Sequence, residues 1–159
     1  MSSKTELPDD VIIRPATAAD ASAIRTIIRA ARLNPFGLDW QRFLVAEAYG
    51  QVVGTGQIKP HQDGSREMSS IAVIPERQGQ GIASAIIKAL LARETGTLYL
   101  MCQSSLEPFY AAFGFRRIEW PELPTSFRPF VRIMRLLYPL TFLVERGGAR
   151  ISVMRRDPG

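Results

Sequence analysis

One glycine-containing segment, residues 73–84, constrains the fold of this chain more than any other. It joins a strand-like run at 68–74 to a helix-like run at 82–94, with Gly79 and Gly81 at the turn between them. Such a turn directs free backbone N–H groups and the positive end of the helix dipole at one point. Glycine permits a positive φ there and close approach of a ligand. The segment therefore suits a phosphate or pyrophosphate, and an ordinary strand–helix turn is the alternative.

The segment lacks the marks of the two most common phosphate-binding loops. It has no Gly-Lys-Ser/Thr ending, which excludes a P-loop. No third glycine follows Gly79 and Gly81 at the spacing of the dinucleotide-binding fold. The turn alone therefore does not say which anion it binds.

The composition is that of an ordinary globular domain, with 46% hydrophobic and 22% charged residues in 159. A net charge of +5 favours anionic ligands without choosing among phosphates, carboxylates, nucleic acid and acidic membranes. The single cysteine, Cys102, and the single histidine, His61, exclude an intrachain disulfide and a Cys/His zinc site. The N-terminal residues carry no apolar core and no apolar run approaches ~20 residues, so we expect a cytoplasmic protein with no secretory signal or transmembrane helix.

Hydrophobic patterns predict the order β-α-β-β-β-α-β-α-β-insert-β, which is an α/β (α+β) fold with one mixed, mostly antiparallel sheet flanked by helices. The predicted strands are 11–14, 43–49, 52–58, 66–74, 97–101, 115–119 and 149–155. Gly50-Gln51 is predicted to be a two-residue hairpin turn. Residues 1–159 are expected to form a single domain, with residues 1–10 flexible.

Three helices are predicted before the insert. The first follows a capping box at Thr17 and Asp20, the second covers 82–94, and the third follows Ser104 and Ser105 and ends at Gly114. The residues expected to face inward are Ile24, Ile27, Ile28 and Ala31 in the first helix and Ile82, Ile86, Ala89 and Leu90 in the second.

The insert, residues 120–148, carries an amphipathic run at 129–138 that Pro139 is expected to end. Its apolar face contains Phe130, Ile133, Met134 and Leu137, and its arginine face contains Arg128, Arg132 and Arg135. Three roles are open for it: a cover for the sheet edge or a homodimer contact, a site for a substrate anion, or a membrane-surface helix.

Three segments stand in an order found in a known family. Gln78-Gly79-Gln80-Gly81-Ile82-Ala83 fits Gln/Arg-x-x-Gly-x-Gly/Ala, Glu67 opens the strand before it, and residues 109–115 fit Phe-Tyr-x-x-x-Gly-Phe. On these segments the chain resembles the GNAT superfamily of acyl-CoA-dependent N-acetyltransferases, over about residues 11–119 plus the last strand. One departure is Gln103, where family members often carry asparagine seven residues before the tyrosine.

The resemblance implies acetyl-CoA as co-substrate, no metal, and direct attack by a primary amine of a small molecule or peptide in a ternary complex. The backbone of residues 78–84 would bind the pyrophosphate, and the Ile71 N–H would polarise the thioester carbonyl. The implied cofactor-binding residues are Ile71, Ala72, Val73, Gln78, Gly79, Gln80, Gly81, Ile82, Ala83 and Ser84. A non-catalytic acyl-CoA-binding module is the alternative function, and no recognition motif supports a nucleic-acid partner.

Two residues are candidates for proton transfer. Glu67 is the candidate general base, with a surface glutamate beside an arginine as the alternative. Tyr110 is the candidate general acid, because a phenol with a pKa near 10 suits a thiolate leaving group, with a tyrosine packed on the core as the alternative. Cys102 is expected to be a small buried thiol, and His61 a solvated loop histidine or a residue at the substrate entrance.

The acceptor pocket of this family is usually built by the segments corresponding to residues 33–41 and 120–148. Aromatic residues there could form an apolar wall: Phe36, Trp40, Trp120, Phe127 and Phe130. The arginines of the insert favour an amine that carries an anionic group over a polyamine, which a basic rim would repel.

Overall fold

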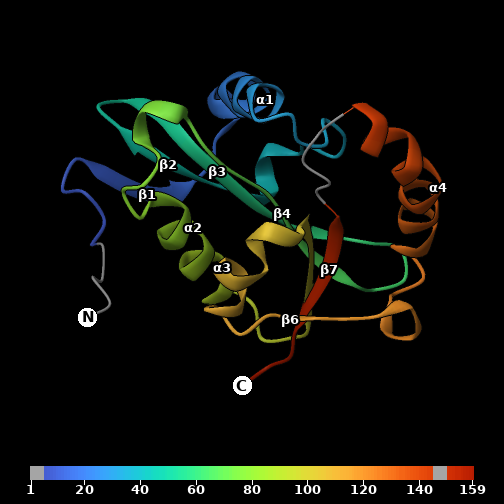
Figure 1. The fold of residues 1–159 in the computed structure, drawn as a ribbon. Helices are drawn as coiled ribbons and strands as arrows, with labels where there is room; N and C mark the ends of the chain where they lie inside the picture. The colour runs from blue at the N-terminus through green and yellow to red at the C-terminus, as the bar shows by residue number, and fades with distance from the viewer. Residues whose placement is uncertain (1–5, 145–149) are drawn as a thin grey trace. The chain divides into compact units, whose positions relative to one another are not determined.

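The structure is a computed structural model that describes residues 6–144 and 150–159, without the side chains of Arg135 and of residues 138–144. Seven strands form one sheet in the order β1-β2-β3-β4-β5-β7-β6 (Figure 1). The pairs β1–β2, β2–β3, β5–β7 and β6–β7 are antiparallel, whereas β4–β5 is parallel. The predicted class, a mixed and mostly antiparallel sheet flanked by helices, is confirmed.

The order of elements along the chain also matches the predicted order. The strands are β1 (Val11–Pro15), β2 (Phe43–Ala48), β3 (Gln51–Pro60), β4 (Arg66–Val73), β5 (Leu98–Gln103), β6 (Arg116–Arg117) and β7 (Ile151–Arg156). The α-helices are α1 (Ala21–Ala30), α2 (Ile82–Leu91), α3 (Glu107–Ala111) and α4 (Arg128–Val144).

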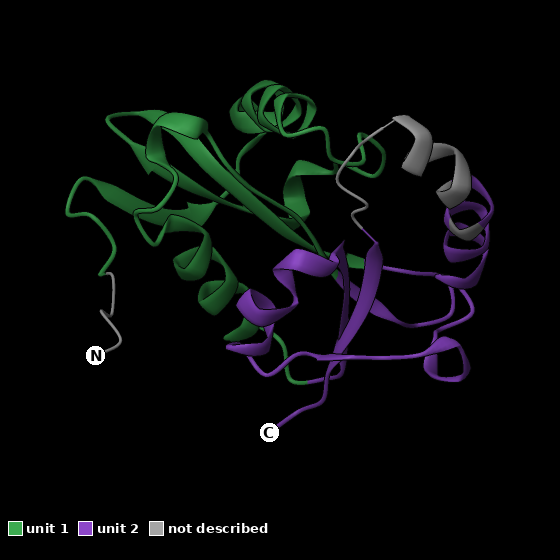
Figure 2. Ribbon diagram, in the orientation of Figure 1, with its two compact units in different colours: residues 1–59, 68–95 green, residues 60–67, 96–159 purple. Residues whose placement is uncertain are grey.

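The chain divides into two compact units, coloured separately in Figure 2. The first unit comprises residues 1–59 and 68–95, and therefore β1, β2, α1, α2 and most of β3 and β4. The second unit comprises residues 60–67 and 96–159, and therefore β5 to β7, α3 and α4. The single domain predicted for the whole chain stays a prediction.

In the first unit, α1 and α2 cover opposite faces of the strands (Figure 1). Successive side chains of a strand point to opposite faces, so Phe43 and Val45 of β2 meet one helix only. They share a core cluster with the buried isoleucines of α1, which are Ile24, Ile27 and Ile28. The α2 face buries Ile82, Ile86, Ile87 and Leu90. Of the predicted inward positions, Ala31 is exposed just beyond the end of α1, whereas Ile87, which was not predicted to face inward, is buried in α2.

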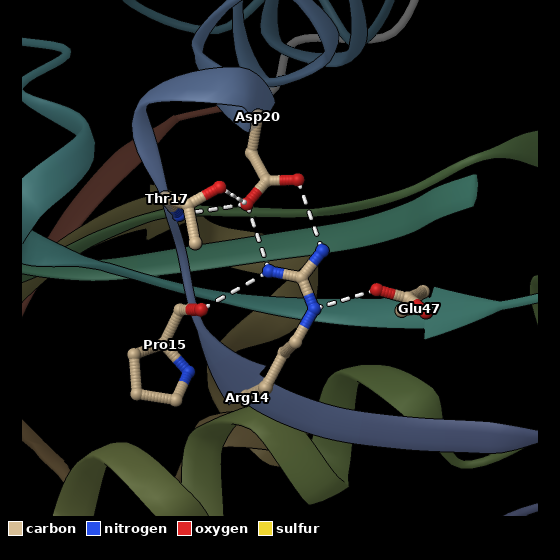
Figure 3. Close-up of polar contacts among 5 residues, drawn as sticks. All are labelled: Arg14, Pro15, Thr17, Asp20 and Glu47. Carbon is tan, nitrogen blue, oxygen red and sulfur yellow. Dashed lines mark hydrogen bonds and ion pairs between the residues drawn. The ribbon is translucent and has the colours of Figure 1, made fainter. Parts of the chain in front are cut away.

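The start of α1 is held by a network centred on Arg14 (Figure 3). The guanidinium donates to Asp20 Oδ2 and Oδ1 at 2.8 and 3.0 Å, and its Nε donates to Glu47 Oε2 at 2.6 Å. Asp20 also accepts from the Thr17 backbone N–H at 2.7 Å, which confirms the predicted capping box. Asp20 is buried, and the hydrogen bond from Arg14 is the main cause that lowers its pKa from 3.8 to about 2.

We expect Asp20→Asn to lower the free energy of unfolding by about 2 kcal/mol at pH 7, because it removes one of the two carboxylate charges that pair with Arg14. A depressed carboxyl pKa contributes stability above the unfolded value of 3.8 and loses it as the pH falls toward 2. The difference between wild type and variant in urea unfolding should therefore be full at about pH 5 and shrink below about pH 4. Asp9→Asn, at an exposed position, is the control, and an equal effect of both variants would contradict the prediction.

The second unit has a core cluster of Ile118, Leu123, Phe127 and Val153. Val131 of α4 and Tyr99 of β5 pack against it. Phe127 is only 1% exposed, so its predicted place in a substrate-facing aromatic wall is wrong. The ring of Phe127 lies inside the second unit because the chain before α4 folds back onto β5 and β7.

Some predicted boundaries were wrong. The β2–β3 turn is Tyr49-Gly50, both with positive φ, because Ala48 pairs with Gln51. A hairpin with two left-handed residues follows the twist of its strands, which displaces the predicted turn by one residue. The predicted strand 115–119 is reduced to Arg116–Arg117. Residue 149, the first of the predicted last strand, lies outside the described residues.

Helix α4 continues through Pro139 to Val144, so the prediction that the proline ends it is wrong. A proline removes one backbone donor, and the residues beyond it can keep helical dihedrals. Phe130, Ile133 and Leu137 of the predicted apolar face are exposed. In the parts of the chain that the structure describes, no helix is long and apolar enough to cross a membrane.

Candidate active site

The glycine turn before α2 leaves its backbone open. Gly79 and Gly81 have φ of 75° and 79°, and Gly81 is the N-cap of α2. No side chain caps this helix and no acidic residue stands in its first turn, so the leading N–H groups have no side-chain acceptor. A Cβ built on Gly79 would meet nothing within 4 Å. An open, uncapped helix start with positive polarity fits a pyrophosphate.

Side chains next to the glycine turn form hydrogen bonds and an ion pair that fix its conformation. Gln78 Nε2 donates to the Val73 carbonyl at 3.0 Å, which ties the loop to the end of β4. Arg77 donates to Gln80 Oε1 at 2.9 Å and forms a two-bond ion pair with Asp10 at 2.8 and 3.0 Å. Asp10 belongs to the N-terminal residues predicted to be flexible, and residues 1–5 lie outside the described part. The side chains of Gln78 and Gln80 thus fix the shape of the loop, which leaves its backbone for a ligand.

Strand β4 changes direction just before Ile71. Ser70 has a φ of 58°, a left-handed conformation that costs a non-glycine residue about 1 kcal/mol or more. Two buried residues of β3 hold it: Thr55 Oγ1 donates to the Ser70 carbonyl at 2.9 Å, and Gln57 Nε2 donates to Ser70 Oγ at 3.0 Å. This local distortion re-aims the backbone of residues 71–73. This distortion was not predicted, although polar Thr55 and Gln57 lie among the buried residues of β3.

A second feature of Gln57 concerns the hydrogen bonds of its side-chain amide. Its Nε2 also donates to the Gly37 carbonyl at 3.3 Å, which fixes the orientation of the amide because a carbonyl only accepts. Its Oε1 is buried and has no hydrogen-bond partner among the described residues. An unpaired buried acceptor is costly, and in a folded protein it indicates a strained or catalytic group or one that bonds to a water or ion.

Glu67, the candidate base, is buried, so it is not the surface glutamate of the alternative interpretation. Its Oε2 lies 2.7 Å from His61 Nε2, and the residue pairs in register with Tyr99 of β5. The interpretation of His61 as a solvated loop histidine is therefore wrong. Its ring packs on Phe127 with centroids 5.0 Å apart, and its side chain is 19% exposed. The histidine lies in a turn that folds back on the start of β4, which composition alone does not reveal.

The turn that carries His61 is anchored by Asp63. Its Oδ1 accepts from the Ser65 backbone N–H and hydroxyl at 3.0 and 2.6 Å. Its Oδ2 accepts from the Thr125 hydroxyl and the Ser126 N–H at 3.0 and 2.9 Å. These bonds, led by the one from the Ser65 hydroxyl, hold the pKa of Asp63 well below its usual range. Asp63 therefore ties the turn to the segment that precedes α4.

Tyr110, the candidate acid, lies in α3 among aromatic rings. The ring of Tyr110 meets Phe109 and Phe115 edge-on, with centroids 5.1 and 6.3 Å away. Burial, and then the nearby Cys102, raise the pKa of Tyr110 to about 12. Cys102 is buried with its pKa raised to about 11, mainly by desolvation, so the prediction of a small buried thiol is confirmed. Tyr110 therefore keeps its proton at any neutral or mildly basic pH.

The predicted site residues fall into two groups. The strand end and glycine turn, residues 71–73 and 78–84, lie in the first unit, and Glu67 and Tyr110 lie in the second. Two insert arginines already have partners: Arg128 Nε donates to the Leu123 carbonyl, and Arg132 lies over the ring of Trp120. The side chain of Arg135 lies outside the described part. Over the described residues, no three His, Cys, Asp or Glu side chains gather as metal ligands do.

Solved structures share this fold. One is Rv2747 from Mycobacterium tuberculosis in complex with CoA and NLQ, at 23% identity and a TM-score of 0.68 over 92% of this chain and 98% of that one. Another is N-acetylglutamate synthase from Neisseria gonorrhoeae with coenzyme A and N-acetyl-glutamate, at 19% identity and a TM-score of 0.72. That match covers 94% of this chain and 35% of the synthase. Ard1 from Thermoplasma volcanium matches at 15% identity and a TM-score of 0.65, over 94% of this chain and 99% of Ard1.

Comparison with protein-family models also indicates an acetyltransferase domain. No curated protein sequence gives a significant match. A family model described as an acetyltransferase (GNAT) domain matches residues 39–117, which include the glycine turn, Glu67 and Tyr110. With the strand order, the glycine turn and this match together, the chain belongs to the GNAT superfamily of acetyltransferases.

Proposed function

We propose that this protein transfers the acetyl group of acetyl-CoA to a primary amine of a small molecule or peptide in a ternary complex. The observation that carries the proposal is the open, uncapped turn at Gly79 and Gly81, which fits a pyrophosphate. Two of the solved structures with this fold contain coenzyme A, in agreement with such a ligand.

Backbone N–H groups of the chain would bind acetyl-CoA, and two side chains would transfer protons. The backbone N–H groups of residues 78–84 would hold the pyrophosphate, and those of Ile71 and Val73 would align the thioester arm. Acetyl-CoA supplies the activated acetyl group. Glu67 would provide the basic group that frees the amine of its proton, and Tyr110 would protonate the departing sulfur.

For the acceptor we propose an amine that carries a carboxylate, such as an amino acid. The solved relatives with this fold include a synthase bound to N-acetyl-glutamate, and the net charge of +5 favours an anionic substrate. The test is a thiol-release assay with acetyl-CoA and three acceptor classes: amino acids, peptides and polyamines. Turnover of polyamines alone would contradict the acceptor class. CoA binding without turnover of any amine would favour the alternative, a non-catalytic acyl-CoA-binding module.

Tyr110→Phe is expected to lower kcat by about 100-fold while leaving acetyl-CoA affinity within about twofold, because it removes only the proton donor. Since the pKa of Tyr110 is raised to about 12, the phenol stays protonated through the assay range, and no loss of rate below about pH 10 should come from its ionisation. Steady-state kinetics over pH, with Phe109→Leu as a control for ring packing, would measure this. An unchanged kcat, where chemistry limits the rate, would refute the acid role.

A further inference from the structure

We propose that His61 and Glu67 act as one proton-accepting pair, in which His61 Nδ1 takes the proton from the substrate amine and Glu67 holds the ring. This inference rests on the proposed function and refines the part that Glu67 plays in it. Glu67 becomes a positioning residue, and His61 becomes the group that meets the amine.

The hydrogen bond between His61 and Glu67 and the exposure of their side chains assign these two roles. The carboxylate of Glu67 accepts from His61 Nε2 at 2.7 Å, so the ring proton lies on Nε2. His61 Nδ1 then carries the lone pair, and it has no hydrogen-bond partner among the described residues. The Glu67 side chain is 9% exposed and that of His61 is 19% exposed. The imidazole is therefore the more accessible member of the pair, and one oxygen of the carboxylate is already engaged.

Contacts of the His61 ring and of the turn that carries it fix the orientation of the ring, as a proton acceptor requires. Phe127 packs against it at 5.0 Å, and Phe127 itself is held by Tyr99 at 5.6 Å within the core cluster. Asp63 ties the turn to Thr125 and Ser126, next to Phe127. A histidine with only a solvated role needs none of these contacts. The carboxylates on the elements around the ring are Glu67 on β4 and Asp63 in the turn, and Phe127 adds no charge.

The step balances without any other reagent. The N–H bond of the substrate ammonium breaks and an N–H bond forms at His61 Nδ1. One positive charge moves from the substrate to the imidazole, while Glu67 remains a carboxylate 2.7 Å from the imidazolium. The amine keeps its electron pair for attack on the acetyl carbon, and the ring later returns its proton to water.

The kinetic test uses His61→Gln and His61→Ala in the full chain. We expect kcat near pH 7 to fall by about 100-fold, with acetyl-CoA affinity within about twofold, and free imidazole to restore part of the activity of His61→Ala. Gln62→Ala, at an exposed position of the same turn, is the matched control and should stay within about twofold of wild type. A His61→Gln enzyme within about threefold of wild type would overturn the pair and leave the proposed function standing.

A second measurement needs no activity. Because His61 is the only histidine, ¹⁵N-histidine labelling reports this ring alone. We expect the free protein to hold the Nε2–H tautomer at about pH 8, and Glu67→Gln to lose that preference. An Nδ1–H tautomer in the wild type would overturn the inference. If wild type acetylates no amine of any class, the proposed function fails and the base role fails with it, whatever the tautomer.

Discussion

Gly81→Glu is expected to weaken acetyl-CoA binding by at least ~100-fold, which corresponds to about 2.7 kcal/mol. Gly81 is the N-cap of α2, where the first N–H groups of the helix have no intrahelical acceptor and are proposed to bind the ligand. A glutamate side chain there places a negative charge where the pyrophosphate is expected. It also fills the space that glycine leaves for close backbone approach.

The control for this variant is Gly50→Glu. Gly50 has a φ of 76°, close to the 79° of Gly81, and a Cβ built on it meets nothing within 4 Å. Both substitutions therefore carry the same left-handed strain and the same change of charge, but only one lies at the start of α2. Titration calorimetry with acetyl-CoA should show binding in wild type and Gly50→Glu and none in Gly81→Glu. Equal affinity in all three would mean that the turn does not hold the pyrophosphate.

The sequence predicted the parts of this protein that short segments determine. The strand pattern before Gly79 and Gly81 and the helix pattern after them were enough to predict a turn at these glycines. Both have the positive φ that such a turn requires. The order of elements followed from hydrophobic period, because a strand alternates and a helix repeats every 3.6 residues. The capping box at Thr17 and Asp20 is likewise a contact within one turn.

The parts that the sequence did not predict depend on contacts between distant residues. His61 meets Glu67 because a turn folds back, and its ring is held by Phe127, more than 60 residues later. The left-handed Ser70 is supported by Thr55 and Gln57 from the neighbouring strand. A polar residue in an apolar strand is the available signal for such contacts. It shows that a partner is needed without showing which one.

Gly56→Ala is expected to lower the free energy of unfolding by about 2–3 kcal/mol, a large effect for one methyl group. A Cβ on Gly56 of β3 would lie 2.6 Å from Ile86 Cγ2, 2.7 Å from Ile71 Cδ1 and 3.1 Å from Leu90 Cδ1. Ile86 and Leu90 are fully buried in α2, so this helix cannot yield without losing its packing against the sheet. Ile71 belongs to the strand proposed to align the thioester arm, so acetyl-CoA affinity should fall as well.

The matched control is Gly96→Ala, where an added Cβ meets nothing within 4 Å and the backbone φ is not left-handed. Urea unfolding should place that variant within about 0.5 kcal/mol of wild type, since surface substitutions without contacts have small effects. If Gly56→Ala were as stable as Gly96→Ala, α2 would not pack on β3 as closely as the structure describes. A stability loss in Gly56→Ala with unchanged acetyl-CoA affinity would separate the two consequences. It would show that the backbone of Ile71 keeps its place when its side chain is displaced.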